Sequence, residues 1–65
     1  MKAGQAAAII RKAIKKTGHN PKNKVWVSNG VVNVDIHRWL DENDLWDVED
    51  AINDLPDGEY DLDIN

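Results

Sequence analysis

The sequence lacks cysteine and has no long apolar run. Without cysteine, neither a disulfide nor a thiolate metal site can form, which fits a reducing compartment. The longest apolar run near the N-terminus, residues 6–10, is far shorter than the ~20 residues that span a bilayer, and it does not resemble the core of a signal peptide. We therefore expect a cytoplasmic protein with no membrane partner. Because the chain has only 65 residues, we expect a single compact domain over residues 1–65.

Negative charge is missing from the first part of the chain, and positive charge is nearly missing from the rest. Residues 1–24 contain no carboxylate and seven lysine or arginine residues, a net charge of +7. Residues 25–65 contain Arg38 as their only strong base and all twelve acidic residues, a net charge of −11 that brings the chain to −4. Because charge segregation bears on partners and solubility rather than on fold, it predicts two charged surfaces and names no activity.

Residues 3–17 show the periodicity of an amphipathic helix. Gly18 is a typical C-terminal stop, and Pro21 prevents the helix from continuing. The cations crowd the C-terminal end, where the helix dipole favours them. One apolar stripe is expected to face the core, and it consists of Ala6, Ile9, Ile10, Ala13 and Ile14.

Residues 24–36 give the clearest local signal, which is a β-hairpin. Asn29-Gly30 is the favoured pair for a two-residue type I′ turn. Pairing across this turn sets Trp26 opposite Asn33 and places the aliphatic side chains on one face of the hairpin and the polar ones on the other. A shift of the register by one residue would mix the two kinds of side chain on each face. The face expected to cover the first helix carries Val25, Val27, Val32, Val34 and Ile36. The opposite face carries Lys24, Trp26, Asn33 and Asp35.

Residues 37–43 allow two interpretations: the strand alternation continues to Leu40, or a helical turn begins at His37. Asp44 is then expected to be the N-cap of a second amphipathic helix, which ends before Pro56. The apolar stripe of this helix is expected to consist of Leu45, Val48, Ile52 and Leu55.

Residues 59–64 alternate and predict a last strand with an acidic outer face. Its inward residues are expected to be Tyr60, Leu62 and Ile64, and its outward residues Glu59, Asp61 and Asp63. The order α-β-β-α-β predicts a two-layer α+β domain, in which two helices cover one face of a three-stranded, mainly antiparallel sheet. The sequence does not decide which hairpin strand pairs with the last strand.

The second helix carries the leading candidate for a binding surface. Three aspartates share one of its flanks at spacings of three and four, with a glutamate and a tryptophan beside them. Carboxylates in such number could imitate the phosphates of a nucleic acid and bind a basic surface of a partner protein. The alternative is a solvated acidic face that keeps a small protein soluble. The candidate residues are Asp47, Glu49, Asp50, Asp54 and Trp46.

The basic first helix offers an alternative site. Its cations could contact the phosphates of a nucleic acid or an anionic membrane. The alternative is an ordinary solvent-exposed face, or neutralisation by the acidic half of the chain. The negative net charge argues against nucleic-acid binding. A further alternative is self-association, in which the basic and acidic faces of two copies join head to tail. The residues of this alternative site are Arg11, Lys12, Lys15 and Lys16.

Trp26 is a second candidate anchor for a partner, because the hairpin register places its indole on the face away from the aliphatic core. An exposed tryptophan among polar residues is typical of an interface. The alternative is that Trp26 packs across the strands over Val31 and Asn33, or that the tail of the chain covers it. Trp39 is expected instead to help close the core.

Catalysis and metal binding find little support in the sequence. No nucleophile is placed beside His19 or His37, and a core of this size leaves no room for a large apolar pocket. The spacing of the acids between Asp54 and Asp63 is not that of an EF-hand loop. We therefore expect no enzymatic activity, no metal and no cofactor.

The first half of the chain resembles the opening of a small helix–hairpin domain, which is associated with large polyvalent proteins of phages and conjugative elements. The resemblance is carried by residues 9–16 (IIRKAIKK), a short loop and residues 24–27 (KVWV). This family usually has a tryptophan and a Gly-Pro pair after the second strand, whereas residues 37–41 here read HRWLD, so no family site is carried over. The resemblance implies a mobile-element context, in which small acidic proteins include inhibitors of host DNA-targeting defences, some of them DNA mimics.

The sequence as a whole predicts a non-enzymatic protein-interaction module, of phage or mobile-element type. Its acidic face would bind a basic, nucleic-acid-binding surface of a partner protein. The alternative is a nucleic-acid-binding accessory protein that uses the basic first helix. The identity of the partner and the oligomeric state are left open.

Overall fold

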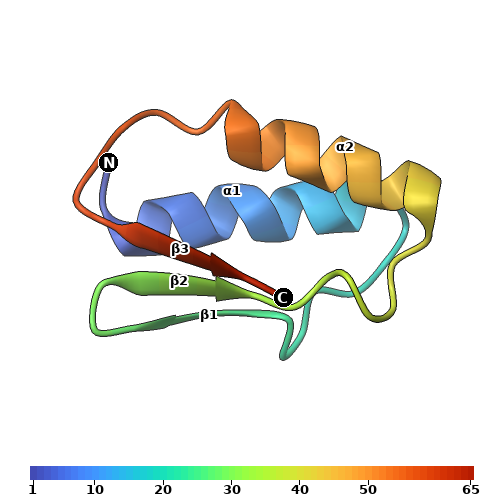
Figure 1. Cartoon of the computed structure of the whole chain (residues 1–65), viewed down its shortest axis with the longest axis horizontal. Helices are drawn as coiled ribbons and strands as arrows, with labels where there is room; N and C mark the ends of the chain where they lie inside the picture. Colours follow the sequence, from blue (N-terminus) through green and yellow to red (C-terminus); the bar gives the residue numbers. More distant parts are fainter.

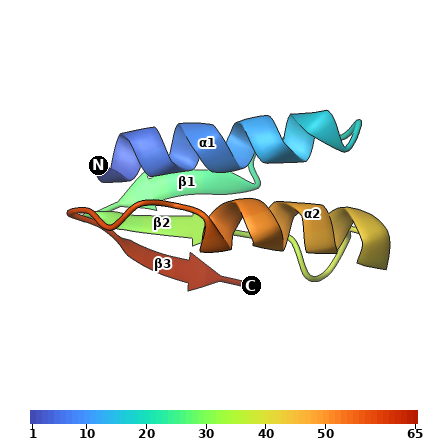
Figure 2. The same cartoon turned by 90° about the horizontal axis from the view of Figure 1, so that it is seen from above.

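The helices and the sheet form two layers. The computed structural model describes residues 1–65. Its elements follow in the order α1 (Ala3–Lys16), β1 (Val25–Ser28), β2 (Val31–Val34), α2 (Glu42–Asn53) and β3 (Asp61–Ile64). Both helices lie along the same face of the three-stranded sheet (Figure 1 and Figure 2). The predicted α+β class, element order and layers are confirmed. The structure contains no helix with the length and hydrophobicity of a membrane span.

The hairpin has the predicted register. Asn29 and Gly30 have φ angles of 52° and 78°, which is the left-handed backbone that a type I′ turn requires. The register sorts the two faces of the sheet, so Val32, Val34 and Ile36 are fully buried beneath the helices. The paired residues are Val25 with Val34, Trp26 with Asn33, Val27 with Val32, and Ser28 with Val31.

The sheet is mixed rather than mainly antiparallel. β2 lies in the centre, with β1 antiparallel on one side and β3 parallel on the other. The parallel pairing follows from α2, which carries the chain back along the sheet before β3 begins, as helical crossovers between parallel strands do (Figure 2). The strand that pairs with β3 is therefore β2, which the sequence did not decide.

The second helix begins earlier than predicted. Its N-cap is Asp41, whose side chain accepts a hydrogen bond from the backbone N–H of Asp44 at 3.0 Å, so Asp44 is not the cap. The helical turn proposed for residues 37–40 is confirmed by a bond of 3.1 Å from the Leu40 N–H to the Ile36 carbonyl. With Asp41 as the cap, Asp44 also falls in the first turn of α2, where the helix dipole favours a negative charge.

Three large side chains predicted to face the core are exposed. Ile9, Val27 and Leu62 expose 38%, 41% and 39% of their surface. Ile9 lies at the margin of the apolar stripe of α1, whose buried centre contains Ile10 and Ile14. Val27 and Leu62 are on the predicted face of the sheet, but they belong to the two edge strands, where no further strand covers their outer side.

The N-terminal residues are held against the segment that precedes β3. Glu59 donates its backbone N–H to the Met1 carbonyl at 2.9 Å, and Lys2 forms an isolated parallel bridge with Glu59. The backbones approach closely at Gly58, where an added Cβ would clash with the Met1 carbonyl. The contact with Met1 therefore requires a residue without a side chain at position 58.

We expect Gly58→Ala to lower the free energy of unfolding by about 1–2 kcal/mol, because it displaces Met1 and breaks a backbone hydrogen bond. Urea unfolding measures this change. The control is Gly4→Ala in α1, where an added Cβ meets nothing within 4 Å. This control should be neutral or stabilising, because alanine is the better helix former. Equal destabilisation by both variants would contradict the close approach at Gly58.

Candidate functional site

The acidic and basic candidate residues meet at one groove between α1 and α2. The groove has a volume of about 550 Å³. We call its two charged sides the basic wall and the acidic wall, and its apolar part the floor. The basic wall is Lys12 and Lys16, the acidic wall is Asp47, Asp50 and Asp54, and the floor is Ile9, Ala13 and Ala51. The two charged surfaces expected from the sequence thus contribute to a single site.

Helical periodicity explains both walls. The two lysines of the basic wall are four residues apart, and the three aspartates of the acidic wall follow at steps of three and four, so each set forms one row along its helix. The helices lie side by side and run in opposite directions (Figure 1). The row on α1 therefore faces the row on α2 across the groove.

No ion pair crosses this groove. The three ion pairs of the structure join His19 to Asp44, His37 to Glu49, and Arg38 to Asp35, and none includes a residue of either wall. All five wall residues are exposed. Their charges are therefore available to a binding partner.

The remaining two acidic-face candidates lie outside the groove. Glu49 has its Oε2 atom 3.8 Å from His37 Nε2. Trp46 is 56% exposed and stands four residues before Asp50, so the two positions are neighbours on one side of α2. Helical spacing therefore places Trp46 beside the acidic wall, whereas Glu49 lies against His37.

The four cations of α1 share one side of the helix, but their side chains have different surroundings. Arg11 donates from Nη2 to the Val25 carbonyl at 3.0 Å, which ties its guanidinium to the edge strand β1. Lys12 and Lys16 form the basic wall, whereas Lys15 is exposed and does not line the groove. In the alternative site expected from the sequence, Arg11 is thus bound to β1, and two of the three exposed lysines face the acidic wall.

Trp26 lies on the opposite side of the molecule from the groove. It is 45% exposed, on the sheet face that carries no helix, as the hairpin register predicted. With Asp35, Arg38 and Asn65 it borders a shallow hollow of about 310 Å³. A partner that covers the acidic wall by a flat surface therefore cannot also reach Trp26.

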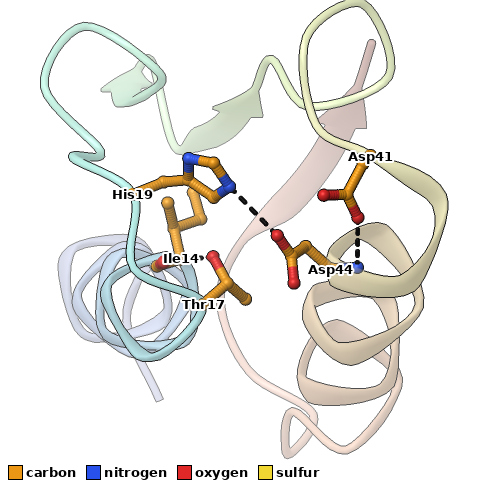
Figure 3. A network of polar contacts seen from close by, with 5 residues as sticks. All are labelled: Ile14, Thr17, His19, Asp41 and Asp44. Carbon is orange, nitrogen blue, oxygen red and sulfur yellow. Dashed lines mark hydrogen bonds and ion pairs between the residues drawn. The ribbon is translucent and has the colours of Figure 1, made fainter.

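A polar cluster joins the end of α1 to the start of α2 (Figure 3). His19 Nε2 lies 3.0 Å from Asp44 Oδ2, and Asp41 accepts the Asp44 backbone N–H. These three residues could each offer one ligand atom to a metal ion, and the atoms lie within 4.8 Å of one another. Their mutual contacts already give each residue a structural role, because they cap α2 and hold it beside α1. The sequence did not reveal this cluster, since His19 and Asp44 are far apart along the chain.

Comparison with known proteins adds no relative. No protein-family model, no curated protein and no solved structure matches this chain. The resemblance based on residues 9–16 and 24–27 therefore stays a prediction.

Proposed function

We propose that this protein is a non-enzymatic protein-interaction module whose acidic wall, with Trp46 beside it, binds a basic surface of a partner protein. The observation that carries the proposal is the row of Asp47, Asp50 and Asp54, which are exposed and have no ion-pair partner. Such a row attracts cationic surfaces from a distance and favours one orientation of docking.

Trp46 supplies the apolar contact that charge alone lacks. More than half of its surface is exposed, next to the acidic wall. Buried aromatic anchors contribute much of the affinity of protein interfaces, whereas charges at the rim mainly affect association rate and specificity. Trp46 and the acidic wall together therefore provide both components of a binding surface.

The spacing of the acidic wall supports a partner that normally holds nucleic acid. A helix rises about 1.5 Å per residue, so the three aspartates span about 10 Å and place one charge about every 5 Å. One strand of DNA carries a charge about every 3.4 Å along the axis. The acidic wall is thus a somewhat sparser row of the same sign, which a surface built for phosphates can accept. A phage or mobile-element inhibitor of a nucleic-acid-binding protein has this chemistry.

Direct nucleic-acid binding by the first helix has less support from the geometry. Arg11 is engaged with the Val25 carbonyl. The basic wall faces three carboxylates across the groove, and these would repel a phosphate backbone. The acidic wall is therefore the better candidate for the binding surface.

Reversing the acidic wall tests the proposal. The variant carries Asp47→Lys, Asp50→Lys and Asp54→Lys. Immobilised protein is incubated with a nuclease-treated bacterial lysate, and the retained proteins are identified by mass spectrometry. We expect the variant to capture at least about tenfold less of the partner retained by the parent protein, because like charges then meet at the interface. Circular dichroism should show an unchanged fold, since the three side chains are exposed.

A second triple variant controls for the change in net charge. It carries Asp57→Lys, Asp61→Lys and Asp63→Lys, which are also exposed and do not line the groove. We expect it to retain the partner. Equal capture by the acidic-wall variant and the parent would overturn the proposal. Recovery of nucleic acid alone, from a lysate not treated with nuclease, would instead assign binding to the first helix.

A further inference from the structure

The groove between α1 and α2 is self-complementary in charge, and we infer that it also binds the same groove of a second copy of this chain. A surface with one acidic and one basic wall can face itself across a twofold axis. Each basic wall then lies opposite the acidic wall of the other copy. This inference does not rest on the proposed function, because it concerns both walls and no external partner.

The required geometry follows from how the two helices lie. A twofold axis parallel to α1 and α2 places α1 of one copy over α2 of the other and keeps every residue at its level along the helices. The two walls line the same groove, so they already occupy the same levels. Within one copy no ion pair crosses the groove. Between two copies, opposite charges face each other directly.

The exposed apolar residues near the groove fit the same arrangement. The contact between His19 and Asp44 shows that the end of α1 lies beside the start of α2. Trp46, in the first half of α2, would therefore lie over the lysine-rich end of the other copy's α1. Lysine stems and ammonium groups pack favourably on an indole face, as Lys24 does within this chain, with its Nζ atom 5.1 Å from the centroid of the Trp39 ring.

The size of the surface sets the expected strength. The chain measures 29 × 21 × 16 Å, so the projected area of a single face is about 600 Å² at its largest, which is small for an interface. Stable interfaces bury about 800 Å² on each partner. We expect a weak dimer with a dissociation constant of the order of 100 μM, and added salt should dissociate it because its contacts are charged. A basic partner would compete with the second copy for the acidic wall.

Analytical ultracentrifugation of the full chain tests for the dimer. Between about 10 μM and about 1 mM protein at low salt, the average mass should rise from 7.3 kDa towards twice that value. High salt should abolish the rise. A mass that stays at 7.3 kDa over the whole range would overturn the inference.

Charge exchange between the walls tests the arrangement itself. One variant carries Lys12→Glu and Lys16→Glu, which makes the groove wholly acidic. The other carries the three aspartate-to-lysine changes of the acidic wall, which makes it wholly basic. We expect each variant alone to stay monomeric, and their equimolar mixture to form a dimer at least about tenfold tighter than the parent dimer. Self-association of either single variant at the parental concentration would overturn the proposed pairing of walls.

The acidic-groove variant also separates this inference from the proposed function. Its acidic wall is intact, so it should still capture a basic partner from the lysate while it no longer dimerises. Loss of the dimer with partner capture retained therefore supports both the proposed dimer and the proposed function. A parent protein that dimerises but captures no partner would overturn only the proposed function.

Discussion

Replacing Ile10 by alanine is expected to leave most of the protein unfolded at room temperature. Ile10 is fully buried in α1 and belongs to the cluster of twelve buried residues that forms the core. Truncating a buried isoleucine to alanine costs about 2–5 kcal/mol. A core in a domain this small rarely supplies more than about 3–5 kcal/mol of net stability. The expected loss is thus comparable with the whole stability of the fold.

The neighbouring residue provides a matched control. Ile9 lies in the same helix but is 38% exposed at the floor of the groove. Because Ile9→Ala removes the same atoms from a partly solvated position, we expect it to cost less than about 1 kcal/mol. Urea unfolding followed by circular dichroism compares the two variants. Equal destabilisation would mean that α1 packs on the sheet in a different rotation about its axis.

The contrast between Ile9 and Ile10 shows what helical periodicity can predict. Spacings of three and four identify an apolar side of the helix, but they do not say how far the neighbouring layer extends over it. Val27 and Leu62 illustrate the same limit in strands, where alternation gives the correct face but not the exposure of an edge strand. How much of a side chain is covered depends on which distant segments pack against it. The local sequence pattern holds no information about that packing.

Local turn chemistry was the strongest guide to the fold. The Asn29-Gly30 turn fixed the hairpin register residue by residue, and the structure confirms it. The start of α2 was misassigned because Asp41 and Asp44 both have a side chain suited to an N-cap, and local sequence does not choose between them. The parallel pairing of β3 was also missed, since it depends on the path of the chain over the whole sheet.

The two walls of the groove were predicted separately, but their meeting was not. Each wall follows from spacing along one helix. Their juxtaposition depends on α1 and α2 packing side by side, and the contact of His19 with Asp44 helps to hold this arrangement. A histidine in a loop and an aspartate in a distant helix give no local signal of such a contact.

Trp39→Ala is expected to cause the largest loss of stability among the tryptophan variants, about 3 kcal/mol. The Trp39 indole N–H donates to the Asp35 carbonyl at 2.6 Å, and the ring packs against the core. The rings of His19 and Trp39 are nearly perpendicular, with their centroids 5.4 Å apart, and the Lys24 ammonium lies over the Trp39 ring. One side chain therefore joins the loop after α1, the start of the hairpin and the turn before α2.

Trp46→Ala is the matched control, because it removes the same side chain from a position that is 56% exposed. It should cost less than about 1 kcal/mol in urea unfolding, yet it should weaken both partner capture and the dimer. Trp39→Phe should fall between the two, since it keeps a ring against the core and loses the hydrogen bond to Asp35, a loss of about 1 kcal/mol. If Trp39→Ala were no more destabilising than Trp46→Ala, Trp39 would not close this end of the core. If Trp46→Ala left capture and dimerisation unchanged, charge alone would account for binding at the groove.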